Sequence, residues 1–143
     1  MVIVDEILVR RIALACSVEH AFEVFTDKID LWWPRSHRRN RDAALTLSKD
    51  ALMERAPDGT HWMMAQVTAI DPPRLLSLDW YPGSPAAPTS VEIEFTADGA
   101  GTVATVTHRP LLETKSIWPQ RVSTFTSGWE AVLPALKCYI EET

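Results

Sequence analysis

Hydrophobic and polar residues alternate with a period of two along much of the chain, which is the pattern of β-strands with one buried face. The clearest case is residues 91–95, where Glu92 and Glu94 alternate with Val91, Ile93 and Phe95. Similar segments predict six further strands, over residues 7–16, 45–48, 52–56, 60–70, 74–81 and 102–108. Arg10 and Arg11 interrupt the alternation and indicate a bulge in the first strand. Asp58-Gly59 and Asp98-Gly99 predict hairpin turns, so we expect an antiparallel sheet.

Three other segments are expected to be helices, and the first and last of them have the 3.6-residue period of amphipathic helices. Ser17 is a suitable N-cap for a helix over residues 18–26, and a second short helix over 28–33 ends before a proline. A long apolar stripe from about Val122 to Glu141 predicts the last helix, with a kink or local break at Pro134. A loop is expected where prolines and glycine gather, at Pro82, Gly83, Pro85 and Pro88. This order of elements predicts one α+β domain over residues 1–143, in which a curved antiparallel sheet wraps around a long C-terminal helix.

Charge and composition exclude several classes of function. The chain has 14 Lys and Arg against 19 Asp and Glu, and its net charge of −5 disfavours a nucleic-acid partner. Its beginning lacks the pattern of a secretory signal and no apolar run is long enough for a membrane helix, so we expect a cytoplasmic protein without a membrane span. Cys16 and Cys138 are expected to be buried free thiols. Because metal-ligand spacings, phosphate loops and nucleophile elbows are missing, we expect no metal and no cofactor.

Short motifs with a consistent order and spacing run through nearly the whole chain. They include residues 18–27, 70–75, 91–95 and 102–108, together with Trp32-Trp33-Pro34, Trp80 and Ser127-Gly128-Trp129. In this arrangement the chain resembles the helix-grip (SRPBCC) superfamily of START and birch-pollen-allergen-like domains, and most closely the family of the C-terminal domain of the heat-shock protein 90 ATPase activator. The resemblance implies a ligand held between the sheet and the last helix. The family's name also implies a role in chaperone regulation and the stress response.

A cavity between sheet and helix would be lined by the side chains expected to point inward. These ligand-binding candidates are Trp33, Met63, Val67, Leu78, Trp80, Ile93, Phe95, His108, Trp118, Phe125 and Trp129. Six of the twelve aromatic residues are Trp, and we expect the rings of Trp33, Trp80 and Trp129 to converge on one space. A mostly apolar cavity with few polar groups is the usual form of a small-molecule site. The alternative is that these side chains fill the interior completely.

Three functions are compatible with this arrangement. The first is non-enzymatic binding of a small hydrophobic or aromatic molecule by a monomer or homodimer. The second is a protein-interaction module that regulates a chaperone ATPase or another partner, with the basic loop Arg35–Arg41 as its contact surface. The third is a cyclase- or hydrolase-type enzyme in which His108 or His61 transfers a proton and Tyr81 or Arg109 polarises a carbonyl. For both histidines, the alternative is a surface or strand-end position without a catalytic role.

Overall fold

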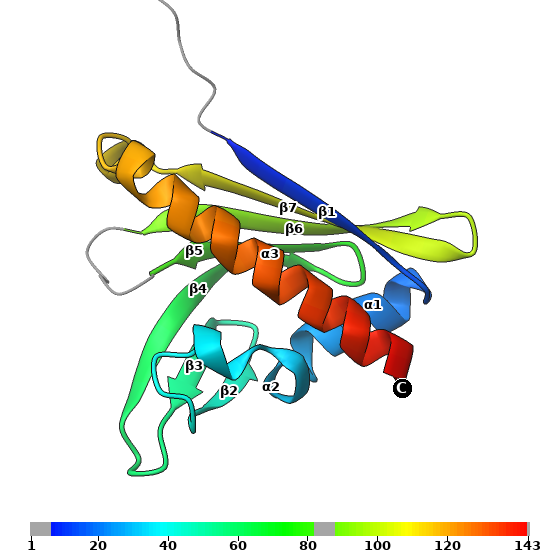
Figure 1. Ribbon diagram of the computed structural model, residues 1–143, viewed down its shortest axis with the longest axis horizontal. Coiled ribbons are helices and arrows are strands. Elements are labelled where there is room, and N and C mark those ends of the chain that lie inside the picture. Colours follow the sequence, from blue (N-terminus) through cyan, green and yellow to red (C-terminus); the bar gives the residue numbers. More distant parts are fainter. Residues whose placement is uncertain (1–6, 82–87, 143) are drawn as a thin grey trace, which may run out of the picture.

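The computed structural model describes residues 7–81 and 88–142, which form one seven-stranded antiparallel sheet with helices on its concave side (Figure 1). The elements in chain order are β1 (Leu8–Leu14), α1 (Val18–Thr26), α2 (Ile29–Trp32), η1 (Arg35–His37), β2 (Ala44–Leu47), β3 (Ala51–Arg55), β4 (His61–Asp71), β5 (Leu75–Trp80), β6 (Thr89–Asp98), β7 (Gly101–Pro110), η2 (Leu112–Thr114) and α3 (Trp118–Glu142). The predicted α+β class and element order are confirmed. The loop predicted at Pro82, Gly83 and Pro85 lies outside the described residues.

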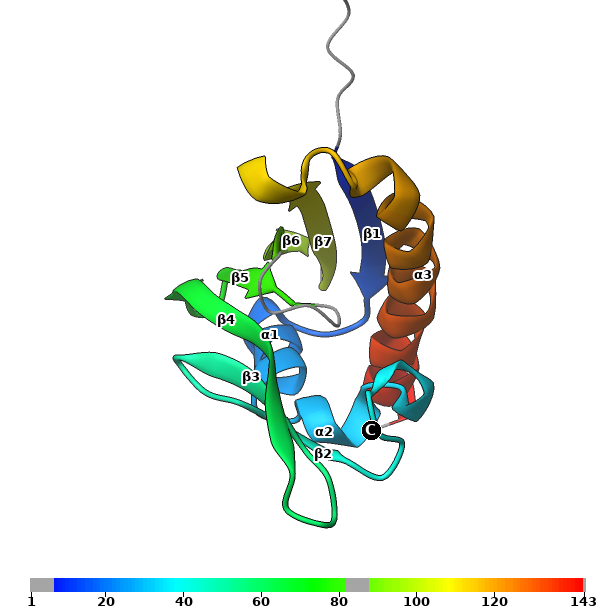
Figure 2. The same ribbon diagram turned by 90° about the vertical axis from the view of Figure 1, so that its left-hand side faces the viewer.

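The strands follow the order β1-β7-β6-β5-β4-β3-β2, so nearly every strand pairs with its neighbour in the chain. Both predicted hairpins are present, and their turns contain glycines with positive φ, Gly59 at 93° and Gly99 at 60°. The bulge expected in β1 is wrong, because β1 pairs with β7 in a continuous register. Register shifts occur instead in the two pairs that β4 forms. One lies at Leu52/Met53 in the pair with β3, and the other at Val67/Ala69 in the pair with β5. Figure 2 shows the sheet curling from β1 toward β3 and β2, with α3 along the side near β1.

The short helix α1 fixes one end of the core. Its N-cap is Ser17, whose Oγ accepts a hydrogen bond from the backbone N–H of His20 at 3.1 Å, as the sequence predicts. Phe22 and Phe25 project from the buried face of this helix onto Phe95 of β6, with ring centroids 5.7 and 5.9 Å apart. The helix therefore covers one end of the concave sheet face.

The long helix α3 begins four residues before the predicted start and continues across Pro134. The predicted local break is therefore wrong. Pro134 has no N–H for the carbonyl of Glu130, but both residues lie on the exposed face of α3, where water can satisfy that carbonyl. Within residues 7–81 and 88–142, none of the helices is long and apolar enough to cross a membrane. Cys16 is half-buried and Cys138 exposed, and both are free, so the expectation of a buried thiol is wrong for Cys138.

Candidate functional site

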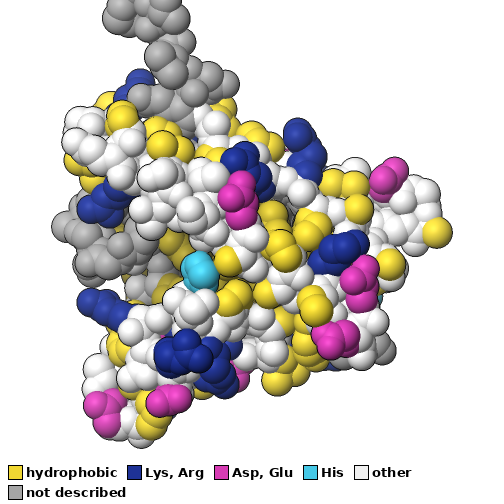
Figure 3. All heavy atoms as spheres, viewed as in Figure 1, with side chains coloured by type: hydrophobic (Ala, Val, Ile, Leu, Met, Phe, Trp, Pro, Cys, Tyr) yellow, Lys and Arg dark blue, Asp and Glu magenta, His cyan; other side chains and the backbone are white. Residues whose placement is uncertain are grey.

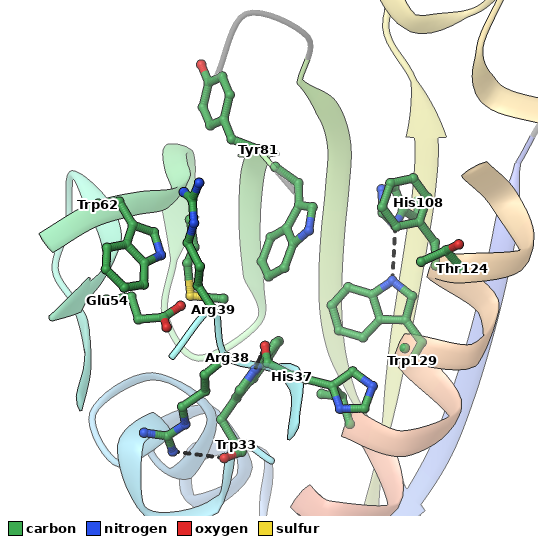
Figure 4. Close-up of a pocket in the computed structure, with 15 residues that line it drawn as sticks. Trp33, His37, Arg38, Arg39, Glu54, Trp62, Tyr81, His108, Thr124 and Trp129 are labelled. Carbon is green, nitrogen blue, oxygen red and sulfur yellow. Dashed lines mark hydrogen bonds between the residues drawn. The ribbon is translucent and has the colours of Figure 1, made fainter. Parts of the chain in front are cut away.

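A cavity of about 320 Å³ lies between the concave face of the sheet and α3. Its volume falls at the lower end of the range of roughly 300 to 1,000 Å³ that is usual for small-molecule sites. Most of its walls are aromatic or aliphatic. The side chains in Figure 4 converge from the segment between α2 and β2 and from β3, β4, β7 and α3. The lining residues are Trp33, His37, Arg38, Arg39, Glu54, Trp62, Met64, Trp80, Tyr81, His108, Thr124, Phe125, Gly128, Trp129 and Val132. The interior between sheet and helix is therefore not completely filled by side chains.

Three indoles form the centre of the apolar wall, and we refer to Trp33, Trp80 and Trp129 as the tryptophan cluster. Trp33 follows α2, Trp80 ends β5 and Trp129 lies midway along α3, so three distant segments meet here. Their ring centroids are 5.9 Å (Trp33–Trp80), 6.2 Å (Trp33–Trp129) and 6.0 Å (Trp80–Trp129) apart. These separations are typical of stabilising aromatic pairs. The convergence predicted from the sequence is present.

His108 lies in β7 and is completely buried behind the tryptophan cluster. The indole N–H of Trp129 donates to Nδ1 of His108 at 3.0 Å, so Nδ1 acts as an acceptor. The neutral ring then carries its proton on Nε2, which lies 2.7 Å from Oγ1 of Thr89 and donates to it. Burial lowers the pKa of His108 to about 3, because the charged imidazolium would be removed from water. The imidazole is therefore neutral at pH 7 and held in one tautomer.

The arrangement of the histidines bears on the enzyme hypothesis. Both ring nitrogens of His108 are engaged by protein groups, so neither is available to move a proton to or from a cavity occupant at neutral pH. Of the two alternative positions for His108, the surface position is wrong, because its side chain is buried, and the residue does lie near the end of β7. His61 is exposed at the start of β4 and does not line the cavity, and Arg109 is exposed as well. Tyr81 does line the cavity. The described site thus offers neither histidine as a proton-transfer group.

Arg38 anchors the loop between α2 and β2, which lines one side of the cavity. Its Nη1 donates to Oδ1 of Asp30 at 2.7 Å and to the carbonyl of Ala43 at 2.6 Å. Its Nη2 donates to the carbonyls of Asp30 and Trp33, both at 2.8 Å. Burial alone would raise the pKa of Asp30, but the N–H of Leu45 and the Arg38 guanidinium outweigh it, and the pKa is lowered. The basic loop is therefore not wholly solvated, because Arg38 is a buried structural residue.

Glu54 is the charged residue that the sequence analysis missed. It lies in β3 with none of its surface exposed, and Figure 4 shows its carboxyl group pointing into the cavity. Oε2 accepts a hydrogen bond from the backbone N–H of Asn40 at 2.9 Å. Oε1 is buried and has no hydrogen-bond partner among the described residues. A signal was present in the sequence, because Glu54 stands two positions after the buried Leu52 and so shares its face of the strand.

The structure separates the sequence-predicted candidates into two groups. Five of them line the cavity: Trp33, Trp80, His108, Phe125 and Trp129. The others lie outside the lining, namely Met63, Val67, Leu78, Ile93, Phe95 and Trp118. Met63 is replaced by its neighbours Trp62 and Met64, because the register shift in the β3–β4 pair changes which β4 side chains face inward. Leu78, Ile93 and Phe95 are buried in the core, and Trp118 packs against His108 with ring centroids 5.3 Å apart.

A curved antiparallel sheet, two short helices after its first strand, and a long C-terminal helix beside a cavity define the helix-grip class of domains. Within that class, the family model that matches this chain covers residues 15–141 and is described as activator of Hsp90 ATPase homolog 1-like protein. The chain belongs to this family. A search of curated proteins found no match.

Solved structures share the fold at low sequence identity. DynU16, a protein in the dynemicin biosynthetic locus, is 18% identical with a TM-score of 0.71. That match covers 96% of this chain and 48% of DynU16, so this chain spans about half the length of that protein. Ms6760 from Mycobacterium smegmatis is 17% identical with a TM-score of 0.68, over 95% of this chain and 91% of that one. CalU16 from Micromonospora echinospora is 20% identical with a TM-score of 0.63, over 94% and 73%.

Proposed function

We propose that this protein binds a small hydrophobic or aromatic molecule in the cavity between the sheet and α3, without transforming it. The observation that carries the proposal is the cavity itself, about 320 Å³ in volume and walled by the tryptophan cluster, Phe125 and Val132. Apolar walls with a small number of polar groups favour a compact ligand that exchanges water for aromatic contact. The engagement of both nitrogens of His108 supports binding rather than catalysis.

Intrinsic tryptophan fluorescence provides the test, because four indoles line the cavity. The protein would be titrated with fatty acids, sterols, flavonoids and aromatic polyketides, and at least one class is expected to change the emission saturably. Occupation of the cavity is then tested by filling it. A Cβ at Gly128 of α3 would meet only Cδ2 of His37, at 4.0 Å, so Gly128→Leu places a larger side chain in open space.

The matched control is Ser127→Leu, which adds a leucine at the neighbouring, exposed position of the same helix. We expect Gly128→Leu to abolish the saturable response and Ser127→Leu to retain it. The proposal is wrong if every ligand class leaves the emission of the wild-type protein unchanged. It is also wrong if both leucine variants bind as the wild type does.

A second candidate function is regulation of a chaperone ATPase or another protein partner, and the description of the family favours it. Lys and Arg side chains gather over the loop between α2 and β2 (Figure 3), where Arg35, Arg39 and Arg41 are exposed. An acidic partner surface would complement them. The test compares the ATPase rate of the chaperone Hsp90 with wild-type protein and with an Arg39→Glu/Arg41→Glu variant. No change in rate on adding the wild-type protein would count against this function.

A further inference from the structure

The cavity contains one buried carboxyl oxygen that nothing in the described chain satisfies. Oε1 of Glu54 is buried without a hydrogen-bond partner, while Oε2 receives the N–H of Asn40. Leaving a buried polar atom unpaired costs about as much as a lost hydrogen bond, and more if the group is charged. Nε of Arg38 is the other buried side-chain nitrogen or oxygen atom that has no hydrogen-bond partner among the described residues. Its guanidinium, however, is turned toward the carbonyl of Trp33, away from the centre of the cavity (Figure 4).

The basic side chains around Glu54 interact with other residues. Arg38 forms its ion pair with Asp30, at 2.7 Å. Arg39 is exposed, and its guanidinium carbon lies 5.3 Å from the centroid of the Trp62 ring, a cation–π position at the edge of the cavity. Among the described residues, Glu54 makes no ion pair with a lysine, an arginine or a histidine. The carboxyl group therefore faces the cavity without an ion pair to a protein cation, although Arg38 and Arg39 line the same cavity.

We propose that the cavity selects aromatic molecules that carry a protonated amino group, which donates a hydrogen bond to Oε1 of Glu54. The inference rests on the proposed binding function and adds the chemical class of the ligand. The rings of such a ligand lie against the tryptophan cluster, and an N–H of its ammonium group donates to Oε1 of Glu54, which otherwise has no donor. Buried charges are tolerated where they are paired and hydrogen-bonded, and indole faces also attract a nearby cation. One ligand group thus satisfies the carboxyl oxygen and balances its charge.

The experiment uses three naphthalene probes that differ in one substituent. 2-Naphthylmethylamine carries an ammonium group at pH 7, 2-ethylnaphthalene is its uncharged isostere, and 2-naphthoate is an anion of similar size. Dissociation constants are measured from the indole N–H resonances of ¹⁵N-labelled protein. The amine is expected to bind about 10- to 100-fold more tightly than 2-ethylnaphthalene, as for a hydrogen bond to a charged group.

Two variants identify the carboxyl group that is responsible. Glu54→Gln is expected to remove the preference for the amine. Glu94→Gln removes the same charge from the exposed side of β6, and it is expected to keep the preference. This control accounts for general attraction between a cation and a protein of net charge −5. If Glu54→Gln does not fold, the order in which the wild-type protein binds the three probes tests the inference. The variant Glu54→Asp then serves as well, because it keeps the charge but withdraws the oxygen, and it is expected to lower the preference for the amine.

Each result has one meaning. Equal binding of the amine and 2-ethylnaphthalene overturns this inference and leaves the proposed function standing, with a water molecule on Oε1. Tightest binding of 2-naphthoate also overturns it, since the arginines would then decide the specificity. A preference that persists in Glu54→Gln assigns the selection to another group and overturns it as well. If none of the three probes binds, the aromatic ligand class fails, and this inference fails with it.

Discussion

The buried imidazole of His108 makes the stability of this fold depend on pH. In the folded protein, burial lowers the pKa of His108 to about 3 from a usual value of 6.5. The unfolded chain therefore binds a proton that the folded chain does not, at every pH between these two values. This contribution to stability is fully present above pH 6.5 and is lost as the pH falls toward 3. The sign is opposite to that of a histidine that gains an acidic partner on folding.

The magnitude follows from the two pKa values. A pKa difference between 6.5 and about 3 corresponds to about 5 kcal/mol of unfolding free energy once both states are protonated. Between pH 7 and pH 5 the linkage relation gives a loss of about 2 kcal/mol. This interval lies above the ordinary pKa range of carboxyl groups, so His108 contributes to the change without a large background from Asp and Glu. His61 is exposed in the structure, so it is a suitable control for the buried His108.

The assay is urea unfolding of the wild type, His108→Gln and the control His61→Gln, followed by tryptophan fluorescence at half-unit steps from pH 7 to pH 5. We expect the wild type and His61→Gln to lose about 2 kcal/mol over this interval, while His108→Gln stays nearly flat whatever its absolute stability. The C2–H proton resonance of His108 should meanwhile show no titration in the folded protein above pH 5. An equal pH dependence in His108→Gln, or a folded-state titration near pH 6.5, would refute the reasoning.

Three further predictions concern close packing and the ion pair between Arg38 and Asp30, and all are measured as unfolding free energies. Gly101→Ala should lose about 1 to 3 kcal/mol, because the new Cβ would lie 2.6 Å from the backbone oxygen of Leu14; an unchanged value contradicts the close approach. Gly128→Ala, with open space around the new Cβ, should instead gain about 0.5 to 1 kcal/mol from helix propensity, and a loss would show that the helix is crowded there. Arg38→Met should lose about 3 kcal/mol, because the carboxylate of Asp30 and three backbone carbonyls lose their donor; a loss below about 1 kcal/mol argues against this role of the buried guanidinium.

The fold could be predicted because its elements follow simple periodicities. The helix over residues 18–26 has the predicted bounds, since a side-chain cap and a run of apolar residues both mark it. The start of α3 was placed four residues too late, although the buried Trp118 continues the apolar stripe one turn before Val122. Pro119 was the available signal there, as proline is favoured in the first turn of a helix. The break at Pro134 was wrong because solvent exposure makes the missing hydrogen bond inexpensive.

For the apolar part of the site, the sequence could predict which strand residues lie on the inner face of the sheet, but not which of them line the cavity. Ile93 and Phe95 do face inward, but Phe22 and Phe25 of α1 cover Phe95, and a strand pattern does not contain that tertiary contact. Met63 failed for a different reason. A single-residue register shift moves a side chain to the other face, and nothing in the sequence near Met63 marks the irregularity opposite Leu52 and Met53.

The polar part of the site was harder to predict, because charged residues are usually assigned to the surface. Glu54 keeps the period-two pattern of β3 and is nevertheless completely buried, so the pattern was the better guide than the charge. Most other buried polar atoms around the cavity have partners: the ring nitrogens of His108 have Thr89 and Trp129, and the terminal nitrogens of Arg38 have Asp30 and backbone carbonyls, whereas Nε of Arg38 has none among the described residues. These pairs hold the walls in place and leave little for a ligand to satisfy. If the cavity binds a ligand as proposed, we expect its selectivity to depend on Oε1 of Glu54, which has no partner among the described residues.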